Sequence, residues 1–301
     1  MKIAAIVVTY NRIELLKKCI LALKAQTVSP DVIIVVNNNS TDGSTEWLNE
    51  QKGLQVIHQE NKGGSWGFQT GIKAAYEQVY DWLWVMDDDT IPHSDSLAAL
   101  LKNIEDVSQL GVNNIGFIGS KVLWKDGSAH LMNLPDIHTF DFKGEAFNSY
   151  DAAKLYGITS CSFVSVLISH QAVQSVGLPI KEFFIWADDQ EYTQRISRAG
   201  FRGFYSSTSA VLHDTPVNYS ANIFTDTLSN AWKYRYGIRN ELFLYRHSSG
   251  WGKFLSKFLK RLLVFPFRIL LKRKDSRWAF IKINMSASLS ALFFNPKVEK
   301  F

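Results

Sequence analysis

The sequence predicts an α/β protein built on a Rossmann-like, mostly parallel β-sheet. Short apolar segments alternate with helical patterns from Met1 to about Asn103, which is typical of strand-helix-strand units. Turn-forming and helix-capping residues follow the apolar segments. The 301 residues, 46% hydrophobic and 20% charged, are enough for a large core. We expect three parts, residues 1–110, 111–221 and 222–301.

The first part alternates strands with helices. β-branched apolar runs indicate the strands, and apolar residues at helical spacing indicate the helices. The expected elements are strand Ile3–Thr9, helix Glu14–Ala25, strand Val32–Val36, strand Leu54–His58, helix Phe68–Val79 and strand Trp82–Met86. Ligands of such sheets collect at the carboxyl ends of the strands. That rule brings residues 9–12, 37–42, 61–68 and 87–89 to one edge.

The rest of the chain is less regular. We expect strands Ile115–Leu123 and Ser162–Ser169 on either side of a long loop, then helices Gln171–Val176 and Glu191–Ala199. Gly177 and Pro179 end the first of these helices. Beyond about Asn222 the pattern is helical.

Cysteine spacing and the lengths of the apolar runs indicate the cellular compartment of the protein. Cys19 and Cys161 lie far apart, without metal-ligand spacing or a disulfide framework. The apolar N-terminus reads as a buried strand rather than a signal peptide, and no stretch has the roughly 18 apolar residues of a spanning helix. We therefore expect a cytoplasmic enzyme.

Three carboxylates follow the strand Trp82–Met86. Alternation along an extended chain places Asp87 and Asp89 on one face, with Asp88 pointing away. Two oxygen ligands suit Mg²⁺ or Mn²⁺, whose other positions are filled by water and phosphates. A solvated acidic turn is the alternative.

A glycine-rich segment, residues 61–68, follows the third strand. Gly63, Gly64 and Gly67 would let backbone amides approach a diphosphate at the start of the next helix. Taken alone, this pattern fits a plain tight turn about as well.

A second acidic group surrounds Asp188, Asp189 and Glu191. These residues would serve equally as a helix cap and first-turn acids. In the functional interpretation Asp189 is a general base, held near an acceptor hydroxyl by Trp186. His213 follows the apolar pair Val211-Leu212 at a strand end. It is either a hydrogen-bonded structural histidine or a nitrogen ligand suited to Mn²⁺.

The C-terminal part contains a basic amphipathic segment. Its apolar residues at helical spacing are Trp251, Phe254, Leu255, Phe258, Leu259 and Leu262. Between Trp251 and Lys274 there are eight bases and no acid, namely Lys253, Lys257, Lys260, Arg261, Arg268, Lys272, Arg273 and Lys274. This pattern favours a helix lying in an anionic membrane interface, and a helix packed on the protein body or an oligomer contact is the alternative.

In combination these motifs resemble family 2 glycosyltransferases of the GT-A fold, within the galactofuranosyltransferase and rhamnosyltransferase group. The resemblance covers Ile3 to about Arg246. Its markers are Val8–Arg12, Asn38–Gly43, Gly63–Phe68, Met86–Thr90, Phe184–Tyr192, His213 and Tyr236–Asn240. It implies a nucleotide-sugar-binding half (1–110), an acceptor-binding half (111–221) and a membrane-associating C-terminal segment.

The resemblance also implies residue roles. Thr9, Asn11, Arg12 and Asn37 would line the nucleotide pocket with Gly63, Gly64, Trp66 and Asp88; Asp87, Asp89 and His213 would hold Mn²⁺ or Mg²⁺; Asp189 would be the base; Asp188, Trp186 and Glu191 would lie near the sugars. The implied reaction is inverting transfer of galactofuranose from UDP-galactofuranose to a lipid-linked glycan at the inner face of the cell membrane.

Other interpretations remain open at this stage. Rhamnosyl transfer from dTDP-rhamnose is the nearest alternative. A metal-dependent phosphohydrolase would also use clustered aspartates, and a non-catalytic membrane scaffold would keep only a vestigial pocket. A homo-oligomer is compatible with the sequence, and no nucleic-acid partner is expected.

Overall fold

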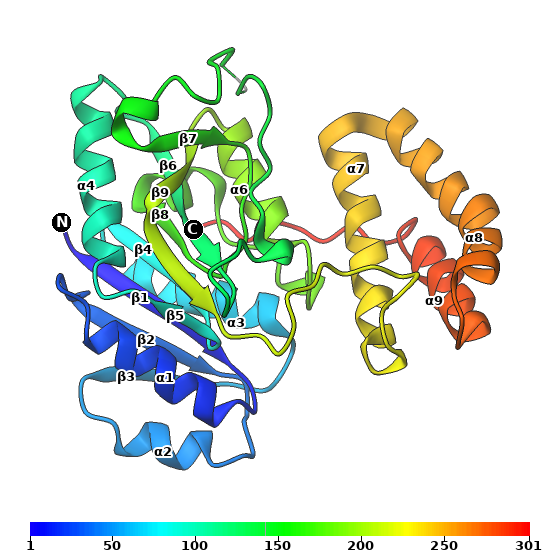
Figure 1. Ribbon diagram of the computed structural model, residues 1–301, viewed down its shortest axis with the longest axis horizontal. Coiled ribbons are helices and arrows are strands. Elements are labelled where there is room, and N and C mark those ends of the chain that lie inside the picture. Colours follow the sequence, from blue (N-terminus) through cyan, green and yellow to red (C-terminus); the bar gives the residue numbers. More distant parts are fainter. Residues whose placement is uncertain (142) are drawn as a thin grey trace. The chain divides into compact units, whose positions relative to one another are not determined.

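The computed structural model describes residues 1–141 and 143–301 and divides into two compact units. The sheet unit comprises residues 1–181, 189–219 and 298–301. The helical unit comprises residues 182–188 and 220–297. Figure 1 follows the chain through the strands and helices of both units.

The sheet unit contains one mixed sheet with helices on both faces. Its strands are β1 (Ile3–Thr9), β2 (Val32–Asn37), β3 (Leu54–His58), β4 (Trp82–Asp87), β5 (Thr90–Pro92), β6 (Ile115–Leu123), β7 (Leu155–Ile158), β8 (Val166–Ser169) and β9 (Arg202–His213). Its helices are α1 (Ile13–Lys24), α2 (Ser44–Glu50), α3 (Gly64–Glu77), α4 (Ser96–Gln109), α5 (His170–Val176) and α6 (Asp188–Arg198), whose first residue belongs to the helical unit.

The strand order is β3-β2-β1-β4-β8-β6-β9-β5, and β7 pairs with β9. The first four strands are parallel, as predicted. β8 runs antiparallel to both β4 and β6, whereas β6 and β9 are parallel. The predicted α/β class is therefore confirmed, and the parallel pairing is concentrated in the half that ends at the carboxylates.

Strand β1 shows why this half is so apolar. All seven of its residues are buried. Ile3, Ala5 and Val7 pack in the core that contains the buried residues of α1 and α4. Ala4 and Ile6, with opposite side-chain direction, pack in the core that contains α3 and α5. A parallel strand covered by helices on both faces needs apolar residues at every position.

Two predicted element starts lie four residues from the observed ones, and two strands were not predicted in full. Helix α3 begins at Gly64, four residues earlier than expected, because Gly67 packs against β1: a Cβ there would lie 2.5 Å from Val8 Cγ1. The strand expected from Ser162 begins at Val166. Strand β7 was not predicted, and of β9 only its end at His213 was recognised.

The helical unit is formed mainly by α7 (Ala231–Leu259), the π-helical turn η5 (Lys260–Val264), α8 (Phe265–Lys272) and α9 (Arg277–Ser290). Helix α7 is kinked at Gly250, where φ is 81°. Phe254, Phe258 and Phe280 lie in its core. No helix in the described part of the chain is both long and apolar enough to cross a membrane.

Candidate functional site

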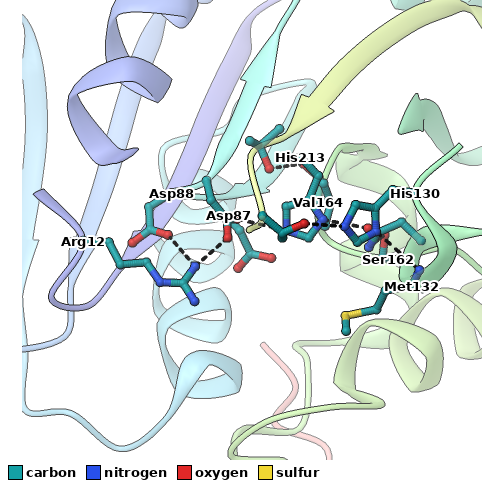
Figure 2. Close-up of polar contacts among 12 residues, drawn as sticks. Arg12, Asp87, Asp88, His130, Met132, Ser162, Val164 and His213 are labelled. Carbon is teal, nitrogen blue, oxygen red and sulfur yellow. Dashed lines mark hydrogen bonds and ion pairs between the residues drawn. The ribbon is translucent and has the colours of Figure 1, made fainter. Parts of the chain in front are cut away.

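The carboxylates after β4 bind the loop that follows β1. Asp88 is buried and accepts hydrogen bonds from Thr9 Oγ1 at 2.7 Å and from Arg12 Nη1 at 3.3 Å. Figure 2 shows Arg12 reaching Asp88. The prediction that Asp88 points away from the site was therefore wrong, because the chain turns at Asp88 instead of continuing β4.

Asp89 joins this loop to the end of β9. Its Oδ2 accepts from Arg12 Nη1 at 2.6 Å, and its Oδ1 lies 3.2 Å from His213 Nε2. The pairing of β5 with β9, in which Thr90 lies opposite His213, produces this juxtaposition. The structure thus brings Asp89 and His213 together, as predicted from residues 124 positions apart in sequence.

A second layer of residues holds His213 in place. Its Nδ1 lies 2.8 Å from Asn133 Oδ1, while Asn133 Nδ2 donates to Ser162. The ring of His130 packs on the ring of His213 with centroids 4.3 Å apart (Figure 2). His130 and Asn133 were missed by sequence reasoning, because they lie in the irregular segment before β7 and have no motif around them.

The charge state of this cluster follows from its burial. Burial raises the pKa of Asp88 to about 6, against the lowering effect of Arg12. Burial also acts to raise the pKa of Asp89, but contacts with His213 and Arg12 outweigh it and leave that pKa below its usual value. Burial and the neighbouring His213 lower the pKa of His130 to about 4. His130 is therefore neutral at neutral pH.

The pair formed by Asp89 and His213 fits a divalent cation. Since the amide oxygen of Asn133 only accepts hydrogen bonds, the proton of a neutral His213 ring lies on Nδ1. In that tautomer Nε2 presents a lone pair 3.2 Å from the buried Asp89 Oδ1, whereas a ring protonated on both nitrogens donates its Nε2–H to the same oxygen, so a divalent cation would take the place of this proton between the two atoms. Two electron-pair donors 3.2 Å apart are stabilised by a cation, and an outer partner on the second nitrogen is typical of metal-bound histidine.

The predicted ligand trio is only partly assembled. Among residues 1–141 and 143–301, no group of three or more His, Cys, Asp or Glu side chains is gathered for a metal ion. Asp87 ends β4 beside this pair in sequence and is half-buried. Mg²⁺ and Mn²⁺ sites in phosphate-transferring enzymes commonly use one or two protein carboxylates and complete their shell with substrate oxygens.

Hydrogen bonds join the loops after β1 and β2, which were expected to form the nucleotide pocket. Asn11, in the left-handed region with φ 53°, accepts a hydrogen bond from the backbone of Thr41 at 2.7 Å. Asn37 is fully buried, and its amide bonds Thr45 and the backbone of Ser40. Asn37 therefore shapes the loop after β2, and the expectation that it faces a nucleobase is not retained.

The glycine-rich segment is a helix start. Gly63, with φ 96°, immediately precedes α3, and Gly64 is the first helical residue. The half-buried Trp66 lies between two ammonium groups, with Lys62 Nζ 4.7 Å and Lys181 Nζ 5.0 Å from its ring centre. Both lysines are also in ion pairs, Lys62 with Glu60 at 3.0 Å and Lys181 with Glu299 at 3.1 Å. The positive charge at this helix start is therefore chiefly that of the α3 N-terminus itself.

Residues 184–187, which directly precede the second acidic group, have a strained backbone that is fixed by hydrogen bonds. Phe184, Trp186 and Ala187 all have φ between 65° and 68°, a conformation that costs non-glycine residues energy. Asn240 of α7, fully buried, donates from Nδ2 to the carbonyls of Phe183, Ile185 and Trp186 at 2.9–3.1 Å. Strain persists only where the surroundings enforce it. Asn240 bonds three carbonyls of this segment, and Arg239 Nη2 also donates to the carbonyl of Phe183 at 3.3 Å.

Helix α6 begins directly after this segment. Asp188 is its first residue and is buried, and Asp189 Oδ1 accepts from the backbone of Gln190 at 2.7 Å. Glu191 is bound by Arg195 through two hydrogen bonds of 2.9 Å. Its carboxylate is committed to this pair, so Glu191 is not retained as an acceptor contact.

Comparisons with known proteins agree with this geometry. Residues 4–167 match the family described as Glycosyl transferase family 2. Galactofuranosyltransferase GlfT1 of Mycolicibacterium smegmatis is 27% identical over 229 residues, 70% of each chain. GlfT1 of Mycobacterium tuberculosis H37Rv is 28% identical over 227 residues, 69% of each chain.

Two solved structures share the fold. GalNAc-T7 with UDP, GalNAc and Mn²⁺ superposes with a TM-score of 0.60 at 12% identity, covering 95% of this chain and 54% of that one. The mannosyltransferase PcManGT of Pyrobaculum calidifontis, with GDP-Man and Mn²⁺, gives 0.53 at 15% identity, covering 98% and 76%. The predicted GT-A fold is confirmed, and the chain spans about half the length of GalNAc-T7.

Proposed function

The chain belongs to glycosyl transferase family 2, and we propose that it transfers galactofuranose from UDP-galactofuranose to a lipid-linked surface glycan with inversion at the anomeric carbon. The observation that carries the proposal is the convergence of Asp88, Asp89, Arg12 and His213 at the carboxyl ends of the strands. The GlfT1 relatives support the choice of sugar. The family assignment leaves no reason to retain the phosphohydrolase alternative.

The donor side of the reaction needs compensation for the negative charge of a diphosphate. Asp89 and His213, with Asp87 nearby in sequence, would hold Mn²⁺ or Mg²⁺, which when bound neutralises the departing UDP. Arg12, half-exposed, already lies beside Asp88 and Asp89, and it is suited to contact a phosphate oxygen once these carboxylates bind a cation. Thr9 and Asn11 position this loop through Asp88 and Thr41.

The acceptor side needs a base. In our proposal Asp189 removes the proton from an acceptor hydroxyl as that oxygen attacks the anomeric carbon from the face opposite the diphosphate. The bond from the anomeric carbon to the diphosphate oxygen breaks, and UDP leaves with the electron pair. Trp186 and Asp188 precede this base directly and are suited to contact the sugars.

A donor screen by thermal shift is the direct test of the sugar assignment. With Mn²⁺ present, UDP-galactofuranose is expected to stabilise the protein more than UDP-galactopyranose, UDP-glucose or dTDP-rhamnose. A ligand at about 100 times its Kd adds about 2.7 kcal/mol to the free energy of unfolding. For a chain of this size that corresponds to a rise in Tm of about 5 °C.

UDP and dTDP alone serve as controls for the nucleotide. A larger shift with dTDP-rhamnose than with any UDP sugar would replace the proposal with rhamnosyl transfer. If UDP-glucose or UDP-galactopyranose gave the largest shift, the galactofuranose assignment would be wrong although the UDP pocket would stand.

Asn240 provides a test of the acceptor side. Asn240→Asp keeps the shape of the side chain but replaces the amide donors with oxygens facing three carbonyls. We expect it to lower kcat for transfer by about 10-fold to 100-fold, because misplacing a base by about 1 Å has effects of that size. The Kd for UDP should stay within about 2-fold, since the donor residues are on other elements.

Asn284→Asp is the matched control. Asn284 is also a fully buried asparagine of the helical unit, and its Nδ2 donates to the carbonyl of Arg261. Both variants lose a buried amide, so a general loss of packing would affect them alike. If kcat fell equally in both, Asn240 would have no special role in placing the acidic segment.

A further inference from the structure

Three aromatic rings of the helical unit form a cluster outside its core. Phe184 and Tyr236 are stacked, with ring centres 4.5 Å apart and ring planes at 15°. Trp232 stands nearly perpendicular to both rings, with its centre 6.3 Å from each of theirs. The core of the unit and the apolar side chains packed on it include Trp186 and Tyr234 but none of these three rings. We call Phe184, Trp232 and Tyr236 the aromatic platform.

The backbone fixes the rings of the platform in place. Trp232 and Tyr236 are four residues apart on α7, so their side chains lie on one face of the helix. Phe184 lies in the left-handed region with φ 68°, and the carbonyl of Phe183 before it accepts a hydrogen bond from Asn240 of α7. Rings whose orientation is set in advance lose little conformational entropy when a ligand binds.

The platform is open to solvent. Trp232 is 47% exposed, and Phe184 and Tyr236 are half-buried. Two cations lie beside the rings, with Lys233 Nζ 5.9 Å from the centre of Trp232 and Arg239 Cζ 5.3 Å from that of Tyr236. Large aromatic side chains that gather at the surface instead of packing in the core mark a binding site.

Polar groups at the edge of the platform are available to a ligand. Within the part of the chain that the structure describes, no hydrogen bond or ion pair uses the Trp232 indole N–H, the Tyr236 hydroxyl or the exposed Arg235 guanidinium. Arg235 is three residues from Trp232 and shares its helix face. This arrangement suits a sugar, whose C–H groups contact the negative face of an aromatic ring while its hydroxyls bind polar groups at the edge.

We propose that the aromatic platform binds a sugar of the acceptor glycan that precedes the sugar receiving the transfer. The inference rests on the proposed function, which makes the acceptor a glycan with Asp189 as its base. Phe184 is five residues before Asp189, and five residues of chain span at most about 18 Å. An acceptor whose hydroxyl lies at Asp189 therefore has its preceding sugars within reach of the platform, so the enzyme should prefer acceptors of two or more sugars.

Other ligands fit the platform less well. An acyl chain would cover the indole N–H, the Tyr236 hydroxyl and Arg235 without offering them a partner, which is unfavourable. A nucleobase would stack on the same rings, but the loops expected to bind the nucleotide follow β1 and β2 of the sheet unit. A sugar chain uses both the rings and the polar groups.

Acceptors of increasing length test the proposal. The probes are octyl glycosides that carry one, two or three residues of galactofuranose, galactopyranose, glucopyranose or rhamnopyranose. Binding to the full chain is measured by ligand-observed NMR without a donor, and transfer is measured with UDP-galactofuranose and Mn²⁺. In at least one series the affinity of the wild-type protein should rise by about 10-fold from one sugar to two or three, because the longer acceptors add contacts with the rings.

Trp232→Leu and Tyr236→Leu each replace a ring with an aliphatic side chain. Each variant should lose about 3-fold to 10-fold in affinity and in kcat/KM for the longer acceptors, the usual size of one aromatic contact. For acceptors of one sugar both values should stay within about 2-fold of the wild type. Trp278→Leu is the matched control, because Trp278 is a 75% exposed tryptophan of the same unit. It should behave like the wild type with every acceptor.

The binding measurement separates this inference from the proposed function. If the longer acceptors bind as expected but UDP-galactofuranose gives no transfer, the platform stands and the donor assignment fails. The platform is overturned if no series gains affinity with length, or if the ring variants lose as much with one sugar as with three. A greater loss of affinity for UDP than for acceptors would assign the rings to the nucleobase instead. A wild-type dimer that Trp232→Leu dissociates would show that the rings join two copies.

Discussion

Replacing Asp189 with asparagine is expected to reduce kcat for glycosyl transfer by about 10²-fold to 10⁴-fold, the usual contribution of a general base. The substitution keeps the size of the side chain and its ability to accept the backbone hydrogen bond from Gln190. It removes only the capacity to take a proton. Donor affinity, measured by calorimetry with UDP and Mn²⁺, should remain within about 2-fold, because the donor residues follow other strands.

The pH profile of the variant gives a second readout. Loss of a general base should flatten the acidic side of the kcat profile relative to the wild type, because the acidic side of such a profile reports protonation of an essential base. Glu182→Gln is the control, because Glu182 is an exposed acid in the same segment whose side chain lies outside the proposed chemistry. Near-normal turnover by Asp189→Asn would assign the base role elsewhere, and Asp188→Asn would then be the variant to measure.

The parallel half of the fold was predictable because three of its four strands, β1, β2 and β4, are buried on both faces. β1 and β3 have the predicted bounds, and β2 and β4 each extend one residue further. The short, continuous apolar runs of β1, β2 and β4 are typical of parallel strands covered by helices on both faces. The carboxylates at the end of β4 and His213, the last residue of β9, were recognisable for the same reason, as polar residues at the ends of apolar runs.

Strand β9 could not be recognised from the sequence, because the residues in its middle are polar. Ser206 and Ser209 are fully buried, and they are satisfied by hydrogen bonds to Asn103 and to the backbone of Ser96. Both partners are about a hundred residues away in sequence, so no local pattern reveals that these serines belong to a core. Apolar periodicity predicts a strand only when burial is achieved by apolar side chains.

The residues that orient the groups of the site could not be predicted, for a related reason. Asn133 and Asn240 each act through hydrogen bonds to residues more than fifty positions away. Nothing in their neighbouring sequence distinguishes them from ordinary loop or helix asparagines. Sequence motifs identified the groups proposed to react, and the structure was needed to find the groups that orient them.

Asp89→Asn and His213→Ala are expected to remove the response of donor binding to Mn²⁺. In the wild-type protein, adding Mn²⁺ should increase the affinity for UDP by about 100-fold, equivalent to about 2.7 kcal/mol. His213→Ala removes one of the two electron-pair donors that lie 3.2 Å apart, and Asp89→Asn removes the negative charge of the other. The affinity of each variant for UDP should therefore be nearly the same with Mn²⁺ as with EDTA. Calorimetric titration of UDP in both conditions makes this measurement.

Asn133→Leu extends this test from the ligands to their support. Without the amide oxygen 2.8 Å from Nδ1, His213 is free to place its proton on Nε2 and to rotate, so Mn²⁺ affinity should fall by about 10-fold to 100-fold. His138→Gln is the control, because His138 is an exposed histidine of the same unit.

A wild-type Mn²⁺ response in Asp89→Asn or His213→Ala would contradict the assignment of this pair as ligands. If only Asn133→Leu behaved like the wild type, the ligand pair would stand and the role of Asn133 would be limited to packing.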